Sequence, residues 1–138
     1  MIKKEQLSEN LEDYLETILA LQTKKTVARS KDIAEKLDIK RGSVTGMLKK
    51  LADNKLINYK PYGYVTLTPE GKKIALEIEQ RHIFLKDFFF RIVKIDEETA
   101  DRTACRMEHA MDKLTFEKFR VFLKKIEACP HCDIGSCP

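Results

Sequence analysis

Residues 30–71 read SKDIAEKLDIKRGSVTGMLKKLADNKLINYKPYGYVTLTPEG, and this stretch decides the fold of the first half of the chain. Ser30 is a suitable N-cap for a short helix over residues 31–37, and residues 38–40 predict a tight turn. A further helix is expected over about 41–54. Its apolar residues recur at the spacing i, i+3, i+4, i+7, which is that of one helix face: Val44, Met47, Leu48 and Leu51.

The spacing of apolar residues changes from helical to alternating between Leu56 and Thr68. Apolar and aromatic residues on both sides of Pro61-Tyr62-Gly63 predict a short two-stranded hairpin. An amphipathic helix over residues 5–22 precedes the quoted stretch. Three helices followed by a hairpin predict a winged helix-turn-helix.

The second half of the chain is expected to be helical, so that the fold class is mainly α. Thr68-Pro69-Glu70 is a typical helix start. Helices are predicted from there to about residue 93, over about 96–113 and over about 115–128. An aromatic stripe across them serves either as core or as part of a homodimer interface: Phe84, Phe88, Phe116, Phe119 and Phe122.

Charge is distributed unevenly along the 138 residues, whose net charge is +4. Residues 1–75 carry 15 Lys and Arg against 10 Asp and Glu, and residues 76–138 carry 11 against 12. A basic half joined to a nearly neutral half is typical of a nucleic-acid reader fused to a second module. No apolar run has membrane-spanning length and no secretory signal is visible, so we expect a cytoplasmic protein without a membrane partner.

The helix that begins at Arg41 is the candidate for reading double-stranded DNA. Its N-terminal half is the part that enters the major groove in this architecture. The candidates for base readout are Lys40, Arg41, Ser43, Thr45 and Gly46. The candidates for phosphate contacts are Lys49, Lys50, Lys60 and Tyr62. An enzyme is not expected, because no nucleophile–base pair or phosphate-cradling glycine loop is apparent.

Cys105, Glu108 and His109 are spaced i, i+3, i+4, which places a thiol, a carboxylate and an imidazole on one turn of a helix. This mixture of donors suits a mid-series transition metal and not Ca²⁺ or Mg²⁺. We expect these residues on a polar face, opposite the apolar residues of the same helix. Asp13 and Glu16, spaced i, i+3, and a second imidazole, His82, could add donors.

With these residues the chain resembles the diphtheria toxin repressor and manganese transport repressor family of metal-dependent transcriptional repressors. The resemblance covers about residues 8–128. It rests on Glu12-Asp13-Tyr14-Leu15-Glu16, the Leu67-Thr68-Pro69-Glu70-Gly71 junction, Arg81-His82 and Ala104-Cys105-Arg106-Met107-Glu108-His109. It implies a homodimer that binds a palindromic operator when loaded with Fe²⁺ or Mn²⁺.

The resemblance also implies ligand sets. The main site would use Asp13, Cys105, Glu108 and His109. A neighbouring second site would use Glu16 and His82, with Glu108 as a candidate bridge. Cys105 favours Fe²⁺ over Mn²⁺, with Zn²⁺ or Co²⁺ able to substitute.

Two departures from the iron-responsive branch concern its ancillary site. Asp101 stands where that branch has a histidine, and Lys86 stands where it has an acid. These two departures count against an ancillary site of that type. We expect a protein of the short type, without the SH3-like domain of longer members. The expected organisation is a winged helix-turn-helix domain over 1–70, a helical metal-binding and dimerisation domain over 71–128, and a Cys-rich tail over 129–138.

The tail lies outside the pattern of the family. Cys129, His131, Cys132 and Cys137 are donors of the kind that hold Zn²⁺ or an iron–sulfur cluster. Two other functions therefore remain open. One is a winged-helix regulator that senses iron–sulfur or thiol chemistry through the tail, and the other is a metal-buffering or interaction module that does not bind DNA.

Overall fold

The computed structural model describes residues 9–60 and 63–129. The chain divides into two compact units, unit 1 (Met1–Gln80) and unit 2 (Arg81–Pro138). Helices dominate both units, and the described residues contain one two-stranded sheet. The expected mainly α fold class is confirmed. Within the described ranges, no helix is long and apolar enough to cross a membrane.

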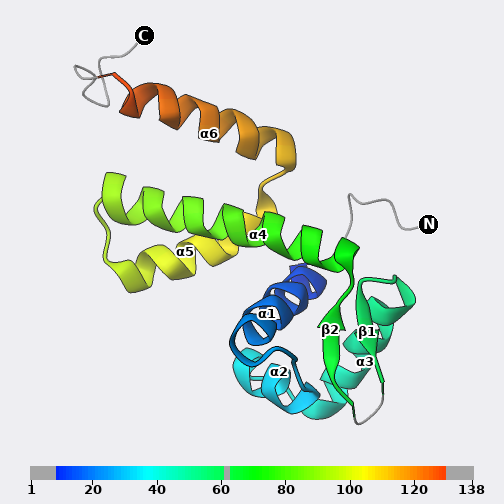
Figure 1. Ribbon diagram of the computed structural model, residues 1–138. Coiled ribbons are helices and arrows are strands. Elements are labelled where there is room, and N and C mark those ends of the chain that lie inside the picture. Colours follow the sequence, from blue (N-terminus) through cyan, green and yellow to red (C-terminus); the bar gives the residue numbers. More distant parts are fainter. Residues whose placement is uncertain (1–8, 61–62, 130–138) are drawn as a thin grey trace. The chain divides into compact units, whose positions relative to one another are not determined.

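Unit 1 has the element order of a winged helix-turn-helix (Figure 1). Its elements are α1 (Glu9–Lys25), α2 (Ser30–Leu37), α3 (Arg41–Asp53), β1 (Ile57–Tyr59) and β2 (Val65–Leu67). The strands pair antiparallel, with Ile57 opposite Leu67. Buried residues from all five elements form one core, which includes Leu15, Ile18, Ile33, Val44, Leu48 and Val65. The predicted hairpin and both helices of the quoted stretch are therefore confirmed.

The connection between α1 and α2 differs from the expected one. Helix α1 continues to Lys25, and Ser30 is the first helical residue of α2 rather than its N-cap. Arg29 takes the N-cap position with an extended backbone and makes no capping hydrogen bond through its side chain. The reason is long-range: Ala28 and Val65 exchange two backbone hydrogen bonds of 3.0 and 2.8 Å. This pairing draws the residues before α2 into the sheet.

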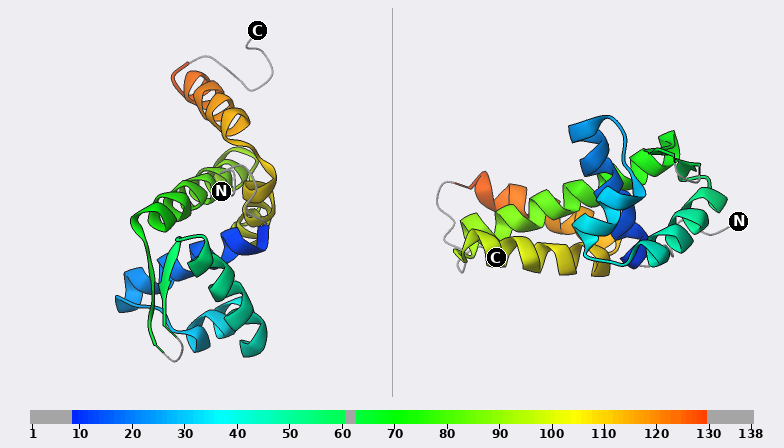
Figure 2. Two further views of the ribbon diagram at one scale, coloured as in Figure 1. Left: turned by 90° about the vertical axis from the view of Figure 1, so that its right-hand side faces the viewer. Right: turned by 90° about the horizontal axis from the view of Figure 1, so that it is seen from below.

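Helix α4 (Pro69–Asp87) begins in unit 1 and ends in unit 2, where it continues into a π-helical turn, η1 (Phe88–Ile92). Unit 2 also contains α5 (Glu97–Ala110) and α6 (Lys113–Glu127). The side chains of Asp96 and Asp112 accept hydrogen bonds of 2.9 and 2.7 Å from the amides of Thr99 and Thr115, and so cap α5 and α6. Helix α5 runs back along the C-terminal part of α4 (Figures 1 and 2).

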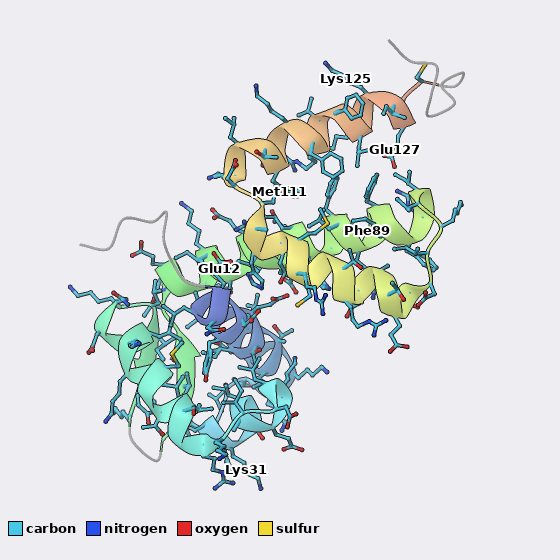
Figure 3. All side chains as sticks on the ribbon, turned by 180° about the vertical axis from the view of Figure 1, so that it is seen from behind. Glu12, Lys31, Phe89, Met111, Lys125 and Glu127 are labelled. Carbon is cyan, nitrogen blue, oxygen red and sulfur yellow. The ribbon has the colours of Figure 1, made fainter. Side chains whose placement is uncertain are left out.

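Most of the aromatic stripe forms the packing between α4, η1 and α6. Phe84 packs edge-to-face on Phe116 and Phe119, with ring centroids 5.3 and 5.6 Å apart, and Phe88 packs on Phe119 at 5.2 Å. Aromatic side chains gather in this region, close to the labelled Phe89 (Figure 3). Phe122 differs, because it is 57% exposed. Four of the five residues of the aromatic stripe therefore pack against one another inside unit 2.

The start of α4 packs closely against the end of the α3–β1 connection. Thr68 accepts a hydrogen bond from the amide of Gly71 (3.1 Å) and so caps the N-terminus of α4, and it donates one to the carbonyl oxygen of Lys55 (2.8 Å). A Cβ atom at Gly71 would overlap the backbone carbonyl oxygen of Leu56. Only glycine allows the helix to approach this carbonyl group so closely.

We predict that Gly71→Ala lowers the free energy of unfolding by about 1–3 kcal/mol, because the backbone must move to admit the methyl group. Gly46→Ala is the matched control: Gly46 lies in α3 with no atom within 4 Å of its added Cβ. There the gain in helix propensity should stabilise the protein by about 0.5–1 kcal/mol. Urea unfolding without metal measures both variants, and equal effects would contradict the proposed close approach.

Candidate metal centre

Helix α5 brings three of the candidate ligands together on one side. One donor atom each of Cys105, Glu108 and His109 lies within 4.8 Å of the other two. Cys105 is exposed, whereas the side chain of His109 is 3% exposed and that of Glu108 is fully buried. The site therefore combines an accessible thiol with two buried donors of different hardness.

The expected division of α5 into an apolar and a polar face is wrong for Glu108. The buried residues of α5 are Ala100, Ala104 and Glu108, spaced i, i+4, i+8 on one face. Met107, although apolar, is exposed. The two alanines are small enough to bring α5 close to its neighbour, and Glu108 continues the same line. A carboxylate thus occupies a position that the pattern assigned to the polar surface.

The carboxylate of Glu108 has a different environment at each oxygen. Oε2 lies 2.8 Å from Nδ1 of His82. Oε1 lies 3.3 Å from Nε2 of His109, but it is buried and accepts no hydrogen bond from any described residue. A buried carboxylate oxygen without a hydrogen bond is costly, and a bound cation would satisfy it. The residues present therefore fit a metal ion.

His82 joins α4 to α5 through both of its ring nitrogens. Nε2 lies 2.9 Å from Oδ1 of Asp101, on the side of the ring away from Glu108. Burial alone would raise the pKa of Asp101, but the hydrogen bond with His82 and the charges of His82 and Lys86 outweigh it, so that the pKa is below its ordinary value. Asp101 is therefore a carboxylate at neutral pH and holds one side of the imidazole.

Arg81, next to His82, holds the end of α5 that carries the ligands. Its Nη1 atom donates hydrogen bonds to the carbonyl oxygens of Glu108 (3.1 Å) and Met111 (3.0 Å). These carbonyl groups belong to the last turn of the helix, where partners within the helix are lacking. No pattern in the sequence indicates this role, because it joins residues 27 and 30 positions apart.

The remaining metal candidates are placed as follows. Asp13 and Glu16 lie three residues apart on α1, in unit 1, and both are partly buried. Cys129 follows the end of α6, and its amide donates to the carbonyl oxygen of Ile126 at 3.1 Å. The other tail candidates, His131, Cys132 and Cys137, lie outside the described residues.

Of the DNA-binding candidates in unit 1, Lys40 precedes α3, Lys60 follows β1, and the others that the structure describes lie on α3. Val44, Leu48 and Leu51 of α3 are buried, which leaves the opposite side of the helix to solvent. Lys40, Arg41, Ser43, Gly46, Lys49, Lys50 and Lys60 are exposed, and Thr45, whose hydroxyl donates to the carbonyl oxygen of Arg41, is partly buried. Tyr62 lies outside the described residues.

The structure adds Arg29 to the basic side chains around the hairpin. Its guanidinium carbon lies 5.2 Å from the ring centre of Tyr64, in a cation–π arrangement. The two residues are 35 positions apart, so the sequence holds no signal of the pair.

Comparison with known proteins explains why these two units occur in one chain. Residues 6–65 match the family model described as "Iron dependent repressor, N-terminal DNA binding domain". Residues 68–134 match "Iron dependent repressor, metal binding and dimerisation domain". The chain belongs to the iron-dependent repressor family. Membership assigns it to the DNA-binding, metal-responsive repressors and confirms the resemblance found in the sequence.

Two individual relatives are transcriptional regulators as well. An uncharacterised helix-turn-helix transcriptional regulator of Methanocaldococcus jannaschii is 35% identical over 88% of this chain and 98% of its own length. The transcriptional regulator MntR of Escherichia coli O157:H7 is 37% identical over 85% of this chain and 75% of its own.

Among solved structures, a manganese-dependent transcriptional repressor in complex with manganese superimposes with a TM-score of 0.75 at 25% identity. The match covers 83% of this chain but only 52% of that structure. This protein thus spans about half the length of that repressor.

We predict that Mn²⁺ stabilises the protein through the buried donors of α5. At a hundredfold excess over the dissociation constant, binding to the native state alone adds about 2.7 kcal/mol to the free energy of unfolding. His109→Ala and Glu108→Gln should remove most of this gain, whereas Glu98→Gln, an exposed change on the same helix, should keep it. Thermal unfolding with and without Mn²⁺ is the measurement. An undiminished gain in both site variants would place the metal elsewhere.

Proposed function

We propose that this protein is a metal-activated repressor in which Fe²⁺ or Mn²⁺ favours the homodimer arrangement that binds a palindromic DNA operator. The observation that carries the proposal is the buried Glu108 carboxylate, whose Oε1 atom beside His109 accepts no hydrogen bond from the described residues. It lies in a chain that also contains a winged helix-turn-helix with a basic exposed side. We expect the protein to work in the cytoplasm on genes of metal homeostasis.

For the main site we propose the ligands Asp13, Cys105, Glu108 and His109. For a neighbouring second site we propose Glu16 and His82, with Glu108 shared between the two. Asp13 and Glu16 are spaced by one helical turn on α1, so both carboxylates lie on the same side of that helix. Ligands drawn from α1 as well as α5 would connect the DNA-binding unit with the dimerisation unit when metal is bound.

For the metal itself we propose Fe²⁺ as the first candidate. A thiolate donor at Cys105 favours a softer ion than Mn²⁺, and Zn²⁺ or Co²⁺ would be accepted by the same donors. The names of the relatives point to manganese for those proteins. Fe²⁺ and Mn²⁺ therefore both belong in any test, under anaerobic conditions.

Helix α3 would place its exposed N-terminal half in the major groove, with the residues around Lys40 to Gly46 reading the bases. Lys49, Lys50 and Lys60 would contact phosphates and fix the register of the protein on DNA. A homodimer presents two such helices, and their spacing must match successive turns of the groove. Metal acts as a switch if it favours this spacing by a few kcal/mol over the alternatives.

The decisive experiment selects DNA from a pool of randomised duplexes with the full-length protein, in the presence and absence of Fe²⁺ or Mn²⁺. We expect one palindromic sequence to be enriched with metal and none without it. Binding to the selected duplex is then measured for Cys105→Ala and His109→Ala. We expect both variants to lose the response to metal, and an undiminished response in both would refute the proposed main site.

We predict that Lys49→Ala and Lys50→Ala each weaken binding to the selected duplex and reduce its salt dependence. Each phosphate contact that is lost should lower the slope of log K against log salt concentration by about 0.9. Lys118→Ala, an exposed change on α6, serves as the control for the loss of a positive charge. A slope reduced equally by all three variants would mean that general charge, and not α3, determines the binding.

We propose the Cys-rich tail as a separate thiolate site for Zn²⁺ or an iron–sulfur cluster, with Cys129, His131, Cys132 and Cys137 as donors. The support is the C-x₂-C spacing with a third cysteine and a nearby histidine. Visible absorption of the protein purified without oxygen distinguishes the two, because an iron–sulfur cluster is coloured and Zn²⁺ is not.

A further inference from the structure

Two pairs of polar residues face one another across the α4–α5 contact, on the side of the His82 ring that faces Asp101 and not Glu108. His82 and Lys86 are spaced i, i+4 on α4, and Glu97 and Asp101 are spaced i, i+4 on α5. The Nζ atom of Lys86 lies 3.3 Å from Oε1 of Glu97 and 3.5 Å from Oδ1 of Asp101. The same Oδ1 atom lies 2.9 Å from Nε2 of His82.

The groups around the ammonium form a set that a divalent ion could use. They are two carboxylates and one imidazole, donors that suit Mn²⁺, Fe²⁺ and Zn²⁺. The hydrogen bond to Glu97 and the charges of both carboxylates outweigh the effect of burial and raise the pKa of Lys86 above its ordinary value. Lys86 is therefore a cation at neutral pH, among groups that could act as metal ligands.

We propose that the Lys86 ammonium is a built-in cation that takes the place of a divalent metal on the Asp101 side of His82, and so confines metal binding to the Glu108 side. A divalent ion bound by Glu97, Asp101 and Nε2 of His82 would have to share these donors with a positive charge at hydrogen-bond distance. The carboxylates are already compensated by Lys86, so such an ion would gain little. The inference rests on the proposed function, because it assigns the side of His82 that faces the regulatory metal.

This arrangement also separates two tasks in unit 2. The Lys86 network links α4 and α5 through groups that all belong to the chain, and this link exists without metal. The donors around Glu108 remain for the ion that regulates the protein.

The experiment counts Mn²⁺ ions per protomer by equilibrium dialysis of the full-length protein. Mn²⁺ is the probe because it prefers nitrogen and oxygen donors and avoids the thiolates of the tail. We expect Lys86→Ala to bind one Mn²⁺ more than the wild type, and Lys86→Ala combined with Asp101→Ala to lose this additional ion. Lys86→Gln, which keeps the length of the side chain and removes its charge, should show the same gain if the alanine variant fails to fold.

The control is Lys73→Ala, which removes an equal charge from an exposed position on the same helix and should leave the count unchanged. A gain in Lys73→Ala as large as that in Lys86→Ala would overturn the proposal, because net charge would then explain it. An unchanged count in a folded Lys86 variant would overturn it as well. A wild type that binds no Mn²⁺ or Fe²⁺ would refute the proposed function instead, and the comparison between wild type and Lys86→Ala would still decide the present inference.

Discussion

The carboxylate of Glu108 has no exposed surface, and the contact between α4 and α5 is built on its partners. A charge removed from water must find charged or polar partners in the protein, or it destabilises the fold. His82 supplies one partner at 2.8 Å from Oε2, and Arg81 holds the backbone of the same residue through its carbonyl oxygen. The oxygen next to His109 accepts no hydrogen bond from the described residues. The proposed metal ion would complete this compensation.

Local patterns in the sequence were sufficient for most of the fold. The change from helical to alternating spacing after Leu56 predicts the hairpin, and Thr68 followed by Pro69 predicts the start of α4. The errors arose where distant segments meet. The pairing of Ala28 with Val65 moves the start of α2, and nothing near Ser30 indicates a partner 37 residues away. Helix boundaries depend on such contacts, because a cap is only one of several ways to satisfy the terminal amides.

The candidate site was likewise predictable where it depends on local spacing and not where it depends on contacts between helices. The spacing of Cys105, Glu108 and His109 was visible because one helix carries all three residues. The burial of Glu108 and His109 is not visible in the sequence, since it depends on how closely Ala100 and Ala104 let α5 approach its neighbour. In the sequence, Asp101 and Lys86 are visible only as departures from the iron-responsive branch. In the folded protein α4 and α5 lie side by side, and Lys86 forms an ion pair with Asp101 at 3.5 Å. This ion pair explains both departures together.

The exposure of Cys105 has a consequence for the kinetics of metal exchange. Because Glu108 and His109 are buried and Cys105 is exposed, the thiol is the first of the three α5 donors that an ion arriving from solvent would reach. Capture would then depend on the softest donor, whereas retention would depend on the carboxylate and the imidazole beneath it. Capture by the thiol and retention by the buried donors would therefore favour different ions. Soft ions would enter readily but gain less from the buried oxygen, and hard ions would enter slowly but be held by it.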